Sequence, residues 1–221
     1  DVINACRFCF MCRHLDPVGN VTFREADTPR GRALICDRIR MNAADLANPD
    51  FIDAIYRSSL SAANRYHCVS GYDEAGLALA ARRDIVEAGL APVPVAALAK
   101  ELEQASFSVK GRGGVLYFGA APELYGGCAV ITGGDPGKAL EALGFAAAAA
   151  KVFARFRKKV PASVKTLVVA EPSAYDFLRG KLPGVEVVHC AEHLLGKGVK
   201  KSRACKAVYL ESDFLKNYCG N

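Results

Sequence analysis

The sequence predicts a mixed fold class, α+β to α/β, in which a helical N-terminal domain precedes a small parallel α/β domain. Residues 1–105 carry apolar positions at helical spacing, with closely spaced cysteines near the start. Over residues 113–221, short apolar runs bounded by glycines alternate with helical segments, which is typical of a parallel sheet. The basic residues also change from mostly Arg to mostly Lys between the two halves. These observations predict two units of different origin.

The first domain, residues 1–105, is expected to begin with a loop over residues 1–20 that holds the clustered cysteines. A Pro-Arg-Gly turn at 29–31 and an Asn-Pro-Asp capping turn at 48–50 each precede an apolar helical pattern. We therefore expect helices over residues 32–41, 51–56, 74–87 and 95–104.

The second domain, residues 113–221, is expected to follow a hinge at Lys110–Gly114. Apolar runs predict strands over residues 115–119, 166–170, 185–190 and 207–210. Helices are expected over residues 137–159, 174–179 and from 192 onward. Because the sequence stops soon after the fourth expected strand, we expect a truncated or reduced α/β domain.

Composition narrows the possible functions. The chain has 221 residues, of which 51% are hydrophobic and 24% charged, so it is globular and not disordered. No apolar run reaches the length of a membrane span, and no signal-peptide pattern opens the sequence. The net charge of +6 comes entirely from residues 111–221, but no nucleic-acid recognition motif accompanies it. We expect no nucleic-acid partner and no membrane span; an acidic partner or solvent would face this charge.

The cysteine content is the unusual feature of the composition. There are nine, an odd number, and three of them fall within seven residues. A secreted disulfide scaffold would be shorter, richer in cysteine and even in count. The cysteines therefore indicate a reducing compartment, which we expect to be the cytoplasm, and they indicate metal binding.

The closely spaced cysteines form the motif Cys6-x2-Cys9-x2-Cys12-x3-Asp16-Pro17. Three thiolates at this spacing wrap a loop around one 4Fe–4S cluster. In bacterial ferredoxins a fourth cysteine followed by proline completes the motif, and here Asp16 takes that place. A zinc site with His14 or His67 as the fourth ligand is the alternative.

A second, degenerate motif ends at Cys68. Read backwards with ferredoxin spacing, its other three positions are Ser58, Ser61 and Asn64. In two-cluster ferredoxins the fourth cysteine of each motif binds the other cluster. One cluster then keeps a full set of thiols: Cys6, Cys9, Cys12 and Cys68. The other would fall on four residues without a thiol: Ser58, Ser61, Asn64 and Asp16. We therefore predict a single 4Fe–4S cluster in a helical, ferredoxin-like domain, with Asp16 as the alternative fourth ligand.

Other residues have weaker signals. Arg30 and Arg32 are candidates to hydrogen-bond cluster sulfides or cysteine carbonyls and so raise the potential, or else to form surface ion pairs. The remaining cysteines share no motif spacing and are expected to be free thiols: Cys36, Cys128, Cys190, Cys205 and Cys219. Phosphate-loop, dinucleotide and acid–base patterns are missing from the sequence, so we expect no catalytic residues on this chain.

Several segments together resemble the iron–sulfur subunit of glycolate oxidase and the related heterodisulfide reductase subunits. They cover residues 5–92 in part: Cys6–Pro17, Thr28–Leu34, Asp50–Arg57, Cys68–Asp73 and Arg82–Val86. In that family a two-cluster ferredoxin-like domain precedes a domain with paired Cys-Cys-Gly motifs. The resemblance implies electron transfer from a flavoprotein dehydrogenase, which would carry FAD or FMN, towards a quinone or another acceptor.

The sequence departs from this family in both domains. The ligands of the second cluster are missing, and no Cys-Cys-Gly occurs. Ala170–Tyr175 and Tyr209–Asp213 lie where the family carries cysteine motifs, so the resemblance implies a reduced second domain without its own metal site and argues against disulfide reduction. We expect an electron-transfer subunit with one cluster in a hetero-oligomeric complex, which could lie at the inner membrane through its partners. The alternative is a structural or assembly subunit whose cluster only stabilises the fold.

Overall fold

The computed structural model describes residues 2–120, 122, 127–198, 206 and 208–220. The chain divides into two compact units, which are described separately. Unit 1 comprises Asp1–Glu101 with Leu140–Ala146, and unit 2 comprises Leu102–Ala139 with Ala147–Asn221. Mixed α/β structure with a mostly parallel sheet agrees with the predicted class.

Unit 1 is helical in its described residues. Its helices are α1 (Val2–Ala5), α2 (Pro17–Thr22), α3 (Pro29–Met41), α4 (Pro49–Tyr56), α5 (Glu74–Glu87) and most of α6 (Val93–Glu103). The expected capping turn at Asn48 is present, because its side chain accepts a backbone N–H at the start of α4. The turn expected at 29–31 is instead the first turn of α3, which begins at Pro29 and is capped by Thr28. The expectation of a plain loop over residues 1–20 is wrong, because α1 and the start of α2 fall within it.

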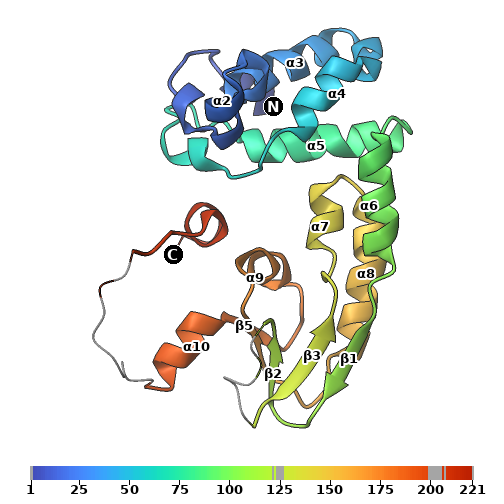
Figure 1. Ribbon diagram of the computed structural model, residues 1–221, viewed down its shortest axis with the longest axis vertical. Helices are drawn as coiled ribbons and strands as arrows, with labels where there is room; N and C mark the ends of the chain where they lie inside the picture. Colours follow the sequence, from blue (N-terminus) through green and yellow to red (C-terminus); the bar gives the residue numbers. More distant parts are fainter. Residues whose placement is uncertain (1, 121, 123–126, 199–205, 207, 221) are drawn as a thin grey trace. The chain divides into compact units, whose positions relative to one another are not determined.

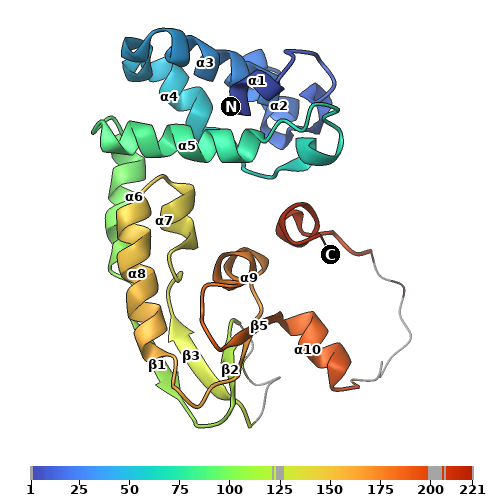
Figure 2. The same cartoon turned by 180° about the vertical axis from the view of Figure 1, so that it is seen from behind.

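The core of unit 1 lies between α3, α4 and α5 (Figure 2). Its buried members come from all three helices: Ile35, Cys36, Ile52, Ala54, Ile55, Ala81 and Ile85. Arg82, on the same helix as Ile85, is also buried and donates to the carbonyls of Ile55, Tyr56 and Ser58. These bonds satisfy carbonyls at the C-terminal end of α4, where a positive charge is favourable.

Unit 2 contains a five-stranded sheet in the order β1-β3-β2-β4-β5 (Figure 1). The strands are β1 (Phe107–Lys110), β2 (Val115–Phe118), β3 (Ala129–Gly133), β4 (Thr166–Val169) and β5 (Glu186–His189). The β1 strand pairs antiparallel with β3, and all other pairings are parallel. In this register Leu116 of β2 lies opposite Ala129 on one side and Leu167 on the other.

Helices and turns complete unit 2. They are α8 (Ala146–Lys159), α9 (Pro172–Leu178), α10 (Cys190–Gly196) and a π-helical turn (Phe214–Tyr218); α7 (Lys138–Ala142) begins in unit 2 and ends in unit 1. Tyr117 packs with Leu194 of α10, whereas the ring of Phe118 meets Phe156 of α8 edge-on at 5.3 Å. Because neighbouring residues of a strand point to opposite faces, α8 and α10 cover opposite faces of the sheet.

Three expectations for the α/β region need correction. The β1 and β3 strands were not predicted, and the expected hinge Lys110–Gly114 contains the end of β1 and its connection to β2. The single helix expected over 137–159 is two helices, because Gly144 has a positive φ of 94° and its backbone lies against Arg82. The strand expected over 207–210 is not formed at 208–210, where the residues are exposed and pair with no strand; residue 207 lies outside the described residues.

Across the described parts of the chain, every helix is too short or too polar to cross a membrane.

Candidate metal centre

Four cysteines of unit 1 line one cavity of about 180 Å³: Cys6, Cys9, Cys12 and Cys68. The first three lie between the end of α1 and a 3-10 turn at Arg13–Leu15, and Cys68 follows the 3-10 turn Ala63–Tyr66. The structure therefore brings together the four thiols that the ferredoxin ligand rule selects from two distant segments. Other residues complete the lining: Arg7, Met11, His67, Val69, Ser70 and Tyr72.

The thiols are close enough to influence one another's ionisation. Burial raises the pKa of the Cys6 thiol, and negative charge on Cys68 and Cys9 raises this pKa further. Burial also raises the pKa of Cys12 to about 11, with charge on Cys6 and Cys9 acting in the same direction. Cys6 and Cys12 therefore disfavour their charged forms unless a cation lies beside them. Metal binding here would therefore release protons.

Among the residues that the structure describes, no group of three histidine, cysteine, aspartate or glutamate side chains is placed to hold one metal ion. A zinc ion needs its ligands to converge on one point. The thiolates of a 4Fe–4S cluster bind different irons and stay further apart. His67 lines the cysteine cavity, whereas His14 lines a different cavity with Phe10 and Asn20.

Backbone N–H groups point at three of the four sulfurs. The N–H of Tyr72 donates to Sγ of Cys68 over an N···S distance of 3.3 Å. The backbones of Phe8 and Arg30 donate to the thiols of Cys6 and Cys12 and oppose the rise in their pKa caused by burial. Hydrogen bonds of this kind stabilise negative charge on sulfur and raise the potential of an iron–sulfur cluster.

Arg30 fixes the conformation of the cysteine loop. Its Nε donates to the carbonyl of Phe8 at 2.6 Å, and its guanidinium lies 4.5 Å from the ring centroid of Phe10. Its Nη1 donates to Glu25 at 2.6 Å. The guanidinium thus contacts both residues that flank Cys9. The carbonyl that it binds belongs to Phe8 and not to a cysteine, and its ion pair with Glu25 is partly buried and not a surface pair. Nothing in the sequence indicated Phe8 as its partner.

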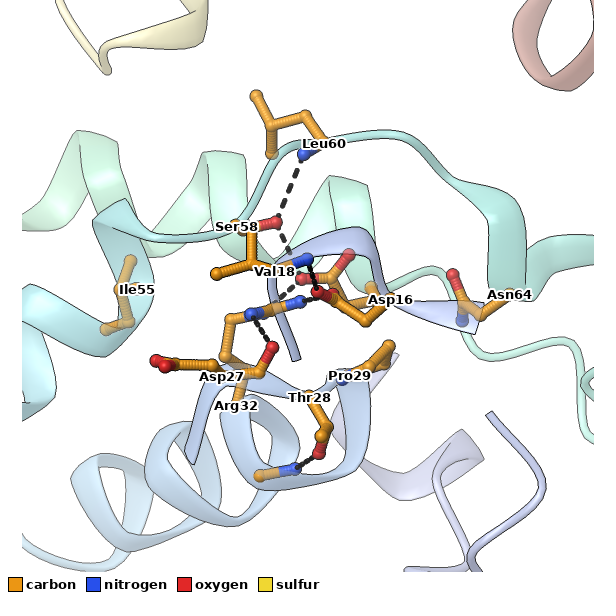
Figure 3. Close-up of polar contacts among 12 residues, drawn as sticks. Asp16, Val18, Asp27, Thr28, Pro29, Arg32, Ile55, Ser58, Leu60 and Asn64 are labelled. Carbon is orange, nitrogen blue, oxygen red and sulfur yellow. Dashed lines mark hydrogen bonds and ion pairs between the residues drawn. The ribbon is translucent and has the colours of Figure 1, made fainter. Parts of the chain in front are cut away.

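Asp16 and Arg32 are not among the residues that line the cysteine cavity. They lie beside each other in unit 1 (Figure 3). One carboxylate oxygen of Asp16 accepts the N–H groups of Val18 and Gly19, and the other accepts from Arg32. Arg32 contacts Asp16, Glu74 and the carbonyl of Asp27. Burial lowers the pKa of Arg32, but the charges of Glu74 and Asp16 outweigh this effect and raise the pKa above its usual value. Arg32 therefore stays charged while 2% exposed.

The backbone of the cysteine motif is repeated in the degenerate motif. Phe8 lies two residues after Cys6, and Leu60 lies two residues after Ser58. Both have a left-handed backbone, with φ of 52° and 55°, which few residues other than glycine adopt. The N–H of Phe8 binds the Cys6 thiol, and the N–H of Leu60 binds Oγ of Ser58 at 3.2 Å. The first ligand position thus has the same local structure in both motifs.

The repeat continues through the rest of the motif. The N–H of Arg13 donates to the carbonyl of Phe10 at 3.1 Å, and the N–H of Arg65 donates to that of Ala62 at 3.0 Å. At the third ligand position, the carbonyls of Cys12 and Asn64 accept from residues 15 and 67, both at 3.1 Å. Every one of these pairs has the same separation along the chain. The segment that ends at Cys68 therefore repeats these local backbone features of the cysteine motif, although Ala62 has a left-handed backbone, with φ of 54°, that the matching Phe10 lacks.

The other described cysteines stand apart from this centre. Cys36 is buried in the core of unit 1, and burial raises its pKa to about 12. Cys128, Cys190 and Cys219 are half-buried cysteines of unit 2 that form no disulfide bond with another described residue. Cys205 lies outside the described residues.

Unit 2 has a cavity of about 470 Å³ at the carboxyl ends of its parallel strands. Its lining includes Gly119, Gly133, Asp135, Glu171 and Ala174. Two of these, Glu171 and Ala174, belong to the segment where the resembling family carries cysteines. None of the residues that form this lining is a cysteine.

No family model, curated protein or solved structure matches this chain.

Proposed function

We propose that this chain is an electron-transfer subunit that holds one 4Fe–4S cluster on Cys6, Cys9, Cys12 and Cys68. The observation that carries the proposal is the gathering of these four thiols around one cavity from two segments with ferredoxin spacing. A bound cluster of this kind supplies reversible uptake of a single electron. The repeated backbone of residues 6–16 and 58–68 supports a ferredoxin-like origin for unit 1.

The residues around the thiols suit exchange of electrons with a docked protein. Cys9 is exposed, and two apolar residues of the cavity lining, Met11 and Val69, are 56% and 83% exposed. Exposed apolar side chains beside a candidate redox site favour contact with another protein over contact with water. Tyr72 is fully buried on the inner side, so water is excluded there.

The partner proposed for this surface is a flavoprotein dehydrogenase that carries FAD or FMN, with a further acceptor in the same hetero-oligomeric complex. This part of the proposal rests on the family resemblance and on the lack of phosphate-binding and dinucleotide motifs in this sequence. None of the cysteines that the structure describes is in a disulfide bond, which suits the reducing cytoplasm.

A redox titration of the anaerobically purified full chain tests the proposal. We expect a reversible one-electron signal in electron paramagnetic resonance of about one spin per chain, within the range of roughly −700 to +450 mV that such clusters span. Iron that is present but never changes its redox state would contradict electron transfer. That result would favour a cluster that only stabilises the fold.

A further inference from the structure

A buried arginine fills the half of the repeat that lacks thiols. Arg32 is 2% exposed, and its three side-chain nitrogens donate hydrogen bonds to three different segments of unit 1. Its Nη2 donates to the Asp16 carboxylate before α2, and its Nε to the Glu74 carboxylate at the start of α5. Its Nη1 donates to the carbonyl of Asp27 at 2.8 Å, in the turn before α3. Figure 3 shows Asp16 and Ser58 gathered around this arginine.

The four residues at the ligand positions of a second cluster already form hydrogen bonds within unit 1. Asp16 binds Arg32 directly, and Oγ of Ser58 donates to Oε1 of Glu74 at 2.8 Å. Oγ of Ser61 accepts from the N–H of Ala63 at 3.4 Å. Nδ2 of Asn64 donates to the carbonyl of Tyr72 at 3.0 Å. None of these four positions offers a thiolate, so the site does not fit a cluster.

The charges explain why an arginine suits this place. Asp16 and Glu74 are each 4% exposed, and two buried carboxylates need positive charge nearby. A guanidinium supplies a permanent charge and a rigid fork that binds two carboxylates at once. It also links segments that are distant in sequence, as a metal cluster does in a small domain.

We propose that Arg32 replaces the second cluster as the cationic cross-link of unit 1, and that its pair with Glu74 limits the chain to one cluster. The proposal rests on the proposed function in one respect, namely that the first half of the repeat binds iron. The contacts of Arg32 and the repeated backbone do not depend on iron binding.

Cluster stoichiometry tests the second part of the proposal. The first variant restores all four ligands and keeps the Arg32–Glu74 pair: Asp16→Cys, Ser58→Cys, Ser61→Cys and Asn64→Cys. The second variant adds Arg32→Ala and Glu74→Ala together, because removal of one partner alone would leave a buried charge unpaired. Each full-length protein is reconstituted anaerobically with ferrous iron and sulfide, and iron and acid-labile sulfide are counted per chain.

We expect about four irons per chain for the wild type and for the first variant, and about eight for the second. About eight irons in the first variant would overturn the proposal, because Arg32 and Glu74 would then be no obstacle. A second variant that stays at about four irons would also overturn it. A wild type without iron would instead refute the proposed function.

Thermal unfolding tests the cross-link independently of any cluster. Arg32→Lys and Arg32→Gln are compared with Arg40→Gln, an exposed arginine of the same helix that pairs with Asp37. We expect the Arg32 variants to unfold roughly 10 °C lower and the Arg40 variant to unfold within about 2 °C of the wild type. Arg32 variants as stable as the Arg40 variant would refute the cross-link.

Discussion

Leu60 repeats the left-handed backbone of Phe8, and each donates its N–H to the side chain two residues before it. One of these side chains is the Cys6 thiol and the other is the hydroxyl of Ser58. A left-handed conformation is costly for a bulky residue. The first ligand position of both motifs therefore has the same local structure, although only one of the two side chains is a thiol.

Arg30 is predicted to hold the cysteine loop in the shape that binds the cluster. Arg30→Leu removes the hydrogen bond to the Phe8 carbonyl and the contact with the Phe10 ring. We expect a loss of stability of about 1–3 kcal/mol and faster loss of iron in air. Iron content over time after exposure to air measures this effect. The control is Arg13→Leu, which also removes a pair with Glu25 but whose side chain is 56% exposed; equal rates of iron loss in both variants would contradict the role of Arg30.

Gly31 lies between Arg30 and Arg32, and the neighbouring backbone leaves no room for a side chain at this position. A Cβ there would lie 2.0 Å from the carbonyl oxygen of Glu25. Because the obstacle is backbone, Gly31→Ala must displace the start of α3 and is expected to destabilise the protein by about 2–3 kcal/mol. Urea unfolding measures the change. Gly76→Ala should cost less, since its obstacle is the movable side chain of Asp73; the reverse order would contradict this explanation.

Cys36 is predicted to react far more slowly with alkylating reagents than the half-buried thiol of Cys128. Burial, aided by the charge of Glu74, raises its pKa from 9.0 to about 12. At pH 8 this lowers the thiolate fraction about 1,000-fold, and the thiolate is the reactive form. Mass spectrometry after timed alkylation should find Cys36 unmodified while half-buried Cys128 reacts. Equal modification rates in the folded protein would contradict the prediction.

The same pKa shift predicts a pH dependence of stability. The unfolded chain releases the Cys36 proton near its usual pKa, whereas the folded chain keeps it. The stabilisation is therefore fully present below about pH 9 and is lost as the pH rises towards 12. The free energy of unfolding of the wild type should fall more between pH 8 and pH 10 than that of Cys36→Ala. Parallel curves for the two proteins would show that this thiol does not contribute.

Arg82 is predicted to stabilise unit 1 through hydrogen bonds to backbone carbonyls. Its Nη2 donates to three carbonyls at the end of α4, and its Nη1 donates to that of Ala142 at 2.8 Å. Arg82→Met removes four hydrogen bonds to backbone carbonyls and should destabilise the protein by about 3 kcal/mol. Arg83→Met, which removes a 42% exposed side chain paired with Glu141, should change stability by under about 1 kcal/mol. Calorimetry of the two variants compares these effects.

Part of the fold could be predicted because its signals are local. The capping turn at Asn48 and the periodicity of α5 each mark a helix in the sequence alone. The β1 strand was missed because it is short and alternates apolar and polar residues at an edge of the sheet. The apolar run near residue 208 was misread because composition cannot show that a segment lacks a strand to pair with.

Part of the candidate site could likewise be predicted from the sequence, and part could not. The spacing of the cysteines and the repeat that ends at Cys68 are properties of the sequence, so the four thiols could be selected without a structure. The roles of Arg32 and Glu74 could not, because they depend on three segments meeting in a buried place. Nothing in the local sequence distinguishes Arg32 from the exposed arginines of the same helix.

The most direct test of the central claim compares the two candidates for the fourth ligand by counting iron. Cys68→Ala and Asp16→Asn are purified anaerobically, with Cys128→Ala as a matched loss of a thiol outside the centre. We expect about four irons and four sulfides per chain in the wild type, Asp16→Asn and Cys128→Ala, and loss of the intact cluster in Cys68→Ala. A full cluster in Cys68→Ala together with its loss in Asp16→Asn would contradict the account.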